Sequence, residues 1–258
     1  MRIYVYDKTF EGLLSAVFDA YTSKIFPDAL HGAEDIPPLM AGSAYTVATG
    51  RDKAERVYAG LARKLSQNAL DGLTYAWLSE LPGSDWVIFR YIRKVFDSSV
   101  SIESKLTDPD VAEVAHAARM TNKEAHLLLG FARFQKTAQG IYFAALAPRH
   151  NVLVIMLPHF TERFADQEWA LYDVNRRYGI YRTQGEYREI SVDDAHAEEN
   201  LRTAGRLPEE QLADTEALFQ NLWKSYFDAA AVTERINPKL QSRCMPRRYW
   251  THMTEKQR

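Results

Sequence analysis

Cysteine is nearly absent from this chain of 258 residues, because Cys244 is its single example. One thiol excludes an internal disulfide, a zinc site built from several cysteines and an iron–sulfur cluster held by this chain alone. Long apolar runs are missing as well. No stretch approaches the roughly 20 apolar residues that span a bilayer, and the opening MRIYVYDKTF lacks the apolar run of a secretion signal. We therefore expect a cytoplasmic protein that does not enter a membrane.

Common catalytic and cofactor-binding motifs are also missing. The sequence contains no G-x-x-x-x-G-K-[ST] phosphate loop, no dinucleotide-binding glycine fingerprint, no G-x-S-x-G nucleophile elbow and no H-E-x-x-H zinc motif. These absences exclude the enzyme classes that depend on such motifs, and we expect neither a metal nor another cofactor. The sequence leaves open whether the protein is an enzyme.

Neither sign of charge dominates the composition. The chain has 32 Lys and Arg residues against 34 Asp and Glu residues, with a formal net charge of -2. No overall field therefore draws it to nucleic acid, and any binding to a polyanion must come from a local patch.

Hydrophobic spacing predicts an α+β fold in which residues 1–130 form a mainly helical lobe. A short N-terminal strand is expected in RIYVY, and AYTVAT further along could be another strand. Helical periodicity is expected over residues 10–21, 51–66, 67–80 and 84–98. Thr121 and Glu124 have the spacing of a capping box, which predicts two helices over 109–130 that meet near Met120.

Residues 131–258 are expected to form an antiparallel sheet lobe. Alternating patterns in FARFQKT, IYFAAL, WALYDV, YGIYRT and EYREI predict the order β-β-α-β-β-β, with a short helix starting just after Pro158. After an acidic stretch at 189–216, an amphipathic helix with apolar rows that include Leu222 and Trp223 is expected to cover one face of the sheet.

The closing segment NPKLQSRCMPRRYW, residues 237–250, combines cations with aromatic rings. Guanidinium groups pair with phosphate, and rings offer faces on which bases stack, so the segment is a candidate nucleic-acid-binding element. The residues proposed for this role are Lys239, Arg243, Arg247, Arg248, Tyr249 and Trp250.

The sheet lobe contributes further cations, and together with the closing segment they could form one basic surface. These residues are Arg133, Lys136, Arg149, Arg163, Arg176 and Arg177. Tyrosines beside Arg176 and Arg177 would suit single-stranded nucleic acid. The alternative is that the arginines neutralise the acidic stretch at 189–216 and that the tyrosines are simply good strand residues.

Catalytic candidates are His150 and His159, with Asp173 as a carboxylate that could join them. APRHNVL places His150 beside Arg149 after a strand, where a loop could present a proton-transfer group next to a cation. Neither histidine has a motif-like spacing, so a structural or hydrogen-bonding role is the alternative.

Several segments resemble one bacterial family of unknown function whose members are labelled DNA-metabolism or DNA-repair proteins. They are YDKTFEGLLSAVFDAY, RFQKT, YFAALAPRHNVL, PHFTERF and NPKLQSRCMPRRYWTHM. The resemblance implies an association with a DNA-modifying radical-SAM protein, and a similar domain is fused to uracil-DNA-glycosylase-like domains. Either chemistry would reside in a partner, because one cysteine cannot hold a radical-SAM cluster and the chain has no glycosylase motif.

Three functions follow from these observations. The first is a DNA-repair accessory protein that binds DNA, single strands included, and works with a separate enzyme. The second is an enzyme acting on nucleic acid or a nucleotide, with His150 as acid or base and with Arg149, Arg163 and Arg177 as a phosphate clamp. The third is a protein-interaction module, which predicts a broad apolar patch near the C-terminal helix.

Overall fold

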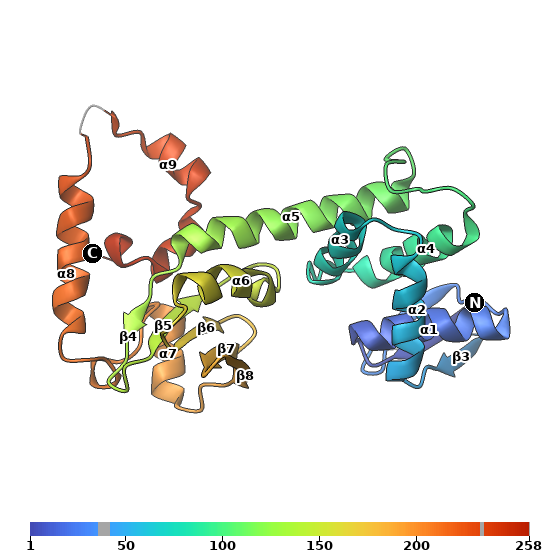
Figure 1. The fold of residues 1–258 in the computed structure, drawn as a ribbon, viewed down its shortest axis with the longest axis horizontal. Helices are drawn as coiled ribbons and strands as arrows, with labels where there is room; N and C mark the ends of the chain where they lie inside the picture. Colours follow the sequence, from blue (N-terminus) through green and yellow to red (C-terminus); the bar gives the residue numbers. More distant parts are fainter. Residues whose placement is uncertain (36–41, 233–234, 258) are drawn as a thin grey trace. The chain divides into compact units, whose positions relative to one another are not determined.

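The computed structural model describes residues 1–35, 42–232 and 235–257 of the chain. It confirms the predicted α+β fold, and the chain divides into two compact units, Met1–Asn122 and Lys123–Arg258 (Figure 1). The division falls within helix α5 (Pro109–Phe131). The lobe boundary expected from the sequence, between residues 130 and 131, lies at the C-terminal end of the same helix. None of the described helices is both long enough and apolar enough to span a bilayer.

The first unit contains a small parallel sheet with β1 (Arg2–Tyr6) at its centre. β2 (Ala29–Gly32) pairs on one side of β1 and β3 (Ser43–Thr46) on the other. Four helices accompany the sheet: α1 (Phe10–Ser23), α2 (Arg51–Ala62), α3 (Gln67–Trp77) and α4 (Ser84–Asp97). The four expected helices are thus confirmed, and the N-terminal strand belongs to a three-stranded sheet.

The prediction of two helices over 109–130 is wrong, because α5 is one continuous helix. Thr121 does not cap a helix start. Its hydroxyl donates to the carbonyl of Ala117 at 3.1 Å, which is the back-bonding that a threonine makes inside a helix. The carboxylate of Glu124 accepts hydrogen bonds from another part of the chain and is not available as a capping partner.

The second unit contains a five-stranded sheet in the order β4-β5-β6-β7-β8. Its strands are β4 (Gln135–Lys136), β5 (Tyr142–Leu146), β6 (Trp169–Asp173), β7 (Tyr178–Thr183) and β8 (Glu186–Ile190). The strand order along the chain is confirmed, but the fully antiparallel sheet is not, because β5 and β6 are parallel. Parallel neighbours need a crossover connection, and α6 (Leu153–Arg163) provides it.

Helix α6 begins five residues before Pro158, so the expected start after this proline is wrong. Leu153, Met156 and Phe160 lie on one buried side of α6. This apolar stripe packs into a core with Leu146 and Leu171 of the sheet, which stabilises the helix although Pro158 lacks a backbone donor.

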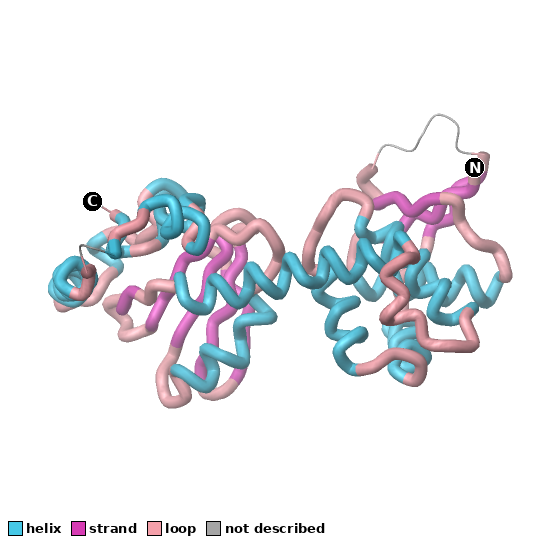
Figure 2. The backbone as a smooth tube through the Cα atoms, turned by 90° about the horizontal axis from the view of Figure 1, so that it is seen from above, coloured by secondary structure: helices cyan, strands magenta, loops and turns pink. Residues whose placement is uncertain are grey.

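Helices cover both faces of the sheet in the second unit, as the magenta strands between cyan helices show (Figure 2). On one face, α6 and the C-terminal part of α5 share a core with the strands, to which α5 contributes the buried Ala125 and Leu128. On the other face, α7 (Ala195–Thr203) places Leu201 against Phe143 and Tyr172. Neither face is left for the later helix.

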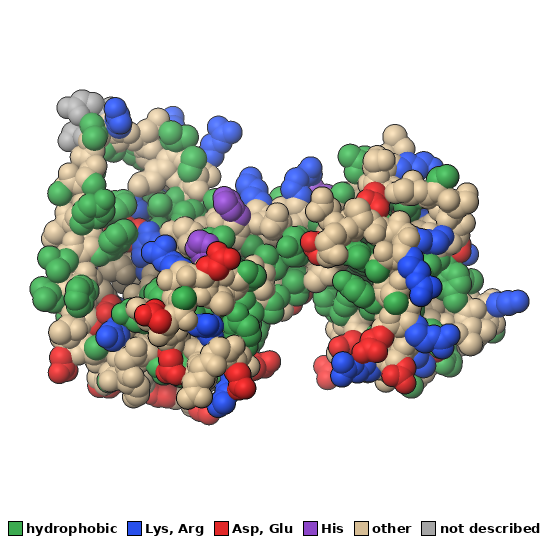
Figure 3. Space-filling model, viewed as in Figure 1, with side chains coloured by type: hydrophobic (Ala, Val, Ile, Leu, Met, Phe, Trp, Pro, Cys, Tyr) green, Lys and Arg blue, Asp and Glu red, His purple; other side chains and the backbone are tan. Residues whose placement is uncertain are grey.

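Helix α8 (Glu216–Ala229) therefore does not cover the sheet, contrary to the sequence-based expectation. Leu218, Phe219, Leu222 and Tyr226 are between 55% and 64% exposed. Figure 3 shows hydrophobic side chains gathered along α8.

The closing segment docks on the core instead. It contains α9 (Pro238–Cys244) and most of a 3-10 turn, η3 (Arg247–His252). A second such turn, η4 (Thr254–Lys256), comes after it, and another, η1 (Glu209–Gln211), follows α7. Tyr249 and Met253 are buried in the same core as Leu128 and Leu146. RRYW is thus anchored by its tyrosine.

Gly205 gives a test of this docking. Its φ is +67°, and a Cβ atom added at this residue would lie 2.1 Å from the Thr251 carbonyl oxygen. We expect Gly205→Ala to destabilise the second unit by at least about 2 kcal/mol, since alanine meets both backbone strain and a clash with the Thr251 backbone directly after the closing segment. Gly185 is a matched control: its φ is +84°, and a Cβ there would meet nothing within 4 Å. Gly185→Ala should cost about 1 kcal/mol from strain alone. Equal losses in urea unfolding of the two variants would contradict the close packing of Gly205 against Thr251.

Candidate nucleic-acid interface

Glu124 in α5 holds together the segments that the sequence proposed as functional. Its side chain is buried, and its carboxylate accepts the backbone N–H groups of Arg149 at 3.1 Å and His150 at 2.8 Å. The hydroxyl of Tyr249 donates to the same carboxylate at 2.5 Å. One buried anion therefore connects α5, the loop after β5 and the closing segment, an arrangement that we call the Glu124 clasp.

Arg248 lies at the outer edge of the clasp. Its Nη2 donates to the Tyr249 hydroxyl at 2.6 Å and lies 3.5 Å from a Glu124 oxygen, while its side chain is about half exposed. Burial, reinforced by the hydrogen bond to Glu124, raises the pKa of Tyr249 to about 12. Tyr249 therefore remains a hydrogen-bond donor at neutral pH, and Arg248 keeps solvent-accessible positive charge next to it.

The loop that carries Arg149 is also fastened by the tip of the β6–β7 hairpin. Asn175 Nδ2 donates to the Pro148 carbonyl at 2.9 Å, and Arg176 Nη2 donates to the Arg149 carbonyl at 3.0 Å. Arg176 is oriented by an ion pair of 2.8 Å with the fully buried Asp173. Burial raises the pKa of Asp173, and its bonds with Arg176 oppose that effect. The Arg149 backbone is thus held from two sides, while its side chain is exposed.

The other proposed residues of the closing segment are Trp250, its neighbour Arg247 and two cations of α9. The indole Nε1 donates to the Met245 carbonyl at 3.0 Å, and the guanidinium of Arg247 lies 5.4 Å from the ring centre. Lys239 and Arg243, four residues apart on α9, are both exposed. Figure 3 shows Lys, Arg and His side chains beside α9 and over the C-terminal part of α5 on the face it displays.

Besides Arg248, which lies 3.5 Å from Glu124, three of the proposed cations form ion pairs with carboxylates. Arg133 binds the buried Glu255 at 2.6 Å, Arg176 binds Asp173, and Arg177 binds Glu198 of α7 at 2.7 Å. Of these three, only Arg177 neutralises the acidic stretch at 189–216. By contrast, no ion pair within the described ranges involves Lys136, Arg149, Arg163, Lys239, Arg243 or Arg247.

The residues proposed for catalysis and for the phosphate clamp lie in different surroundings. His150 is buried with its backbone held by Glu124, and His159 is exposed on α6 with its ring 5.1 Å from that of Phe160. Arg163 lines a cleft beside α8, whereas Arg177 binds α7. Within the described part of the chain, no group of three His, Cys, Asp or Glu side chains could hold a metal ion.

A cleft of about 460 Å³ between α8 and the β4–β5 region contains the three remaining sheet-lobe cations, Arg133, Lys136 and Arg163. We call it the α8 cleft. Its aromatic lining consists of Phe134, Tyr142, Phe164, Phe219 and Trp223.

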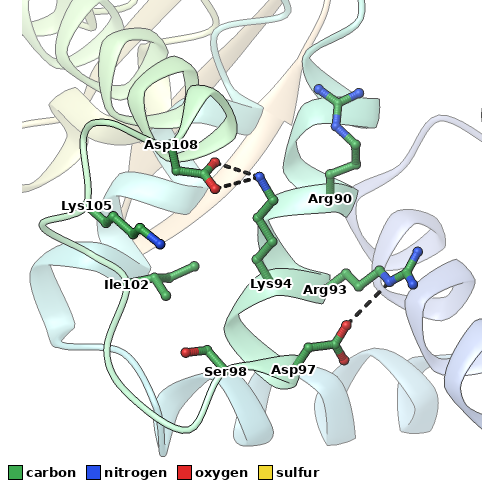
Figure 4. A pocket seen from close by; sticks show the side chains of 8 residues that line it. All are labelled: Arg90, Arg93, Lys94, Asp97, Ser98, Ile102, Lys105 and Asp108. Carbon is green, nitrogen blue, oxygen red and sulfur yellow. Dashed lines mark hydrogen bonds and ion pairs between the residues drawn. The ribbon is translucent and has the colours of Figure 1, made fainter.

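The first unit has a cavity of about 510 Å³ beside α4, which is also lined by cations (Figure 4). Here the charges are largely compensated. Lys94 lies 2.6 Å from Asp108, and Arg93 lies 3.4 Å from Asp97. Lys105 extends into the cavity without a drawn partner, but a single lysine among these ion pairs gives little preference for an anion.

Glu124 is the residue that the sequence analysis missed. Its spacing from Thr121 assigned it to a capping box, a local explanation that concealed its long-range role. A glutamate on the apolar face of KEAHLLLGF was the available signal, because a carboxylate is rarely buried without partners.

The fold and these contacts define an α+β protein whose second unit presents cations and aromatic rings on a carboxylate-centred scaffold. A family model described as a domain of unknown function, DUF4130, matches residues 82–255. The match covers more than half of the chain and includes the Glu124 clasp and the α8 cleft, and the chain belongs to the DUF4130 family.

Comparison with curated proteins gives no match to this sequence. Among solved structures, the chain is similar to a pGpG-specific phosphodiesterase, PggH from Vibrio cholerae. The two share 12% sequence identity with a TM-score of 0.34, over 89% of this chain and 99% of that chain.

Proposed function

We propose that this protein is a nucleic-acid-binding accessory protein of DNA metabolism or repair, which holds DNA for a separate radical-SAM or uracil-DNA-glycosylase-like enzyme. The observation that carries the proposal is the Glu124 clasp. It fixes the backbone at Arg149 and the position of Arg248 while leaving charge on both side chains accessible to solvent.

Pre-positioned cations without carboxylate partners suit phosphate binding, because a phosphate can bind them without displacing an internal anion. Arg149, Arg243 and Arg247 are exposed and make no ion pair in the described ranges. Trp250, which is partly exposed next to Arg247, offers a ring on which an unpaired base could stack. This combination favours single strands over a duplex, whose bases are already stacked.

The two alternatives differ in how much support they receive. The enzyme alternative needs His150 as an accessible acid or base next to a phosphate clamp. His150 is buried, however, while Arg163 lines the α8 cleft and Arg177 binds Glu198 of α7. The interaction-module alternative is supported by the exposed apolar face of α8. That face is also compatible with an accessory protein that binds its enzyme.

Replacing Arg149, Arg243 and Arg247 together by glutamine is expected to weaken DNA binding and to reduce its salt dependence. If about five phosphates are engaged, the log-log salt slope for single strands is about -3 to -4, and loss of three contacts should bring it to about -1 to -2. Fluorescence anisotropy with labelled single- and double-stranded DNA over a salt series measures both quantities. These side chains are exposed, so the variant should unfold at the same urea concentration as the native protein.

Arg188→Gln is the matched control, since Arg188 is an exposed cation on β8 whose nearest carboxylate, on Glu186, is 3.5 Å away. It should bind DNA as the native protein does. If native protein fails to bind either form of DNA at low salt, the proposal is overturned and the interaction-module reading takes its place.

A further inference from the structure

We infer that the α8 cleft is a binding site for a single nucleotide unit, meaning one unpaired base that carries a phosphate. The inference shares the nucleic-acid chemistry of the proposed function, but it depends on a separate set of side chains. The two can therefore fail independently.

The charges of the cleft favour an anion. Lys136 and Arg163 line it, and neither makes an ion pair in the described ranges. The third cation, Arg133, is neutralised by Glu255. The one carboxylate in the lining, Glu216, is buried and accepts the Lys136 backbone N–H at 3.0 Å and the Gln220 amide at 3.1 Å. Lys136 and Arg163 are thus the two lining cations without an ion pair, and with Glu216 counted against them the cleft keeps a net positive charge that a phosphate could contact.

The rings of the cleft favour a planar ligand. On the sheet side, Tyr142 and Phe164 are stacked with their centres 5.4 Å apart. On the opposite side, α8 contributes Phe219, which is 60% exposed, and Trp223, whose indole donates to Glu255 at 2.8 Å. An apolar ring as exposed as Phe219 gains from being covered, and a base inserted between the two walls would cover it.

The cations lie next to the rings. Lys136 Nζ is 5.7 Å from the centre of the Tyr142 ring, and the Arg163 guanidinium is 6.0 Å from that of Phe164. This separation is comparable with the reach from a base to its own 5′-phosphate. A cleft of about 460 Å³ is of the size that holds one small ligand and is too small for a duplex. The shared chemistry fits either a free nucleotide or one unpaired nucleotide of a strand.

The test compares dAMP with deoxyadenosine by titration calorimetry on the full chain. Lys136→Gln/Arg163→Gln should weaken dAMP binding at least tenfold and change deoxyadenosine binding less than twofold, since only dAMP carries the phosphate. Phe219→Ala should weaken the binding of both ligands, because the proposed contact is between this ring and the base. Arg188→Gln, which removes an exposed cation far along the sheet order on β8, should change neither.

Further measurements separate the ligand sources and the two proposals. If a single-stranded DNA of ten nucleotides binds more than tenfold tighter than dAMP and is displaced by dAMP, the natural ligand of the site is a nucleotide within a strand. Equal or weaker binding of the strand assigns it to a free nucleotide. The Arg149/Arg243/Arg247→Gln variant should bind dAMP normally. Absence of dAMP binding at millimolar concentration, or unchanged dAMP binding in the Lys136/Arg163 variant, overturns the inference without affecting the proposed DNA surface.

Discussion

Replacement of Glu124 by alanine is expected to lower the free energy of unfolding of the second unit by roughly 3 to 5 kcal/mol. The change removes the acceptor of two backbone N–H groups, those of Arg149 and His150, and of the Tyr249 hydroxyl. The donors on His150 and Tyr249 are buried and the one on Arg149 is partly buried, so water replaces the carboxylate poorly and the lost bonds carry a desolvation cost. Urea unfolding followed by circular dichroism measures the effect.

Tyr249→Phe separates the closing segment from the rest of the clasp. This variant keeps the ring in the core and loses only the hydroxyl that binds Glu124, so a loss of about 1 kcal/mol is expected. Limited proteolysis should release the closing segment faster in Glu124→Ala than in Tyr249→Phe. A Glu124→Ala loss below about 1 kcal/mol would show that the clasp is not a principal element of the fold.

Acidification from pH 7 to pH 4 is expected to destabilise the protein through His252, a buried residue of η3. Burial lowers the pKa of His252 from 6.5 to about 4, although a hydrogen bond with the Gly205 backbone acts in the opposite direction. Its Nδ1 has no hydrogen-bond partner within the residues that the structure describes. Protonation would place an unpaired charge in the core.

The direction of this pH effect follows from how many protons the folded and unfolded states bind. Between pH 6.5 and 4 the unfolded chain binds a proton at His252 and the folded chain does not, so folding stability falls as the pH falls. The contribution is fully present above pH 6.5, and its loss through this window amounts to about 3 kcal/mol.

His252→Gln isolates this contribution, because glutamine is neutral throughout the range. Carboxylates such as Glu255 add their own acid sensitivity: although burial acts to raise its pKa, hydrogen bonds from Arg133 and Trp223 hold that pKa below its usual range. The acid sensitivity that comes from these carboxylates should be the same in the native protein and in His252→Gln. The stability of the variant, measured by urea unfolding at pH 7, 5.5 and 4, should decline less steeply than that of the native protein. Parallel declines would contradict a buried neutral His252.

Local patterns were sufficient for most elements of the fold. The four helices of the first unit and the five strands of the second unit have clear periodicities, because helix and strand periods depend on neighbouring residues. The α+β class followed from those periods. The same patterns did not show that β5 and β6 are parallel, since strand direction depends on how α6 returns the chain across the sheet.

The candidate interface was predicted in composition but not in arrangement. Cations and rings in 237–250 were apparent, whereas the burial of Tyr249 was not, because it results from contact with a core built largely by residues 125–180. The sequence did not show which cations bind carboxylates and which have no such partner. Arg133 and Glu255 form their ion pair across 122 positions of the chain.

Local periodicity was enough to place most helices and strands, and composition was enough to show that basic and aromatic residues concentrate near the C-terminal end. Three features arise from tertiary contacts and have no local signature: Glu124 joins three distant segments, α8 leaves an apolar face exposed, and Lys136 and Arg163 share a cleft with aromatic rings. The physical reason is that periodicity and capping depend on neighbours along the chain. Desolvation, ion pairing and pocket shape depend instead on which distant side chains the fold brings into contact.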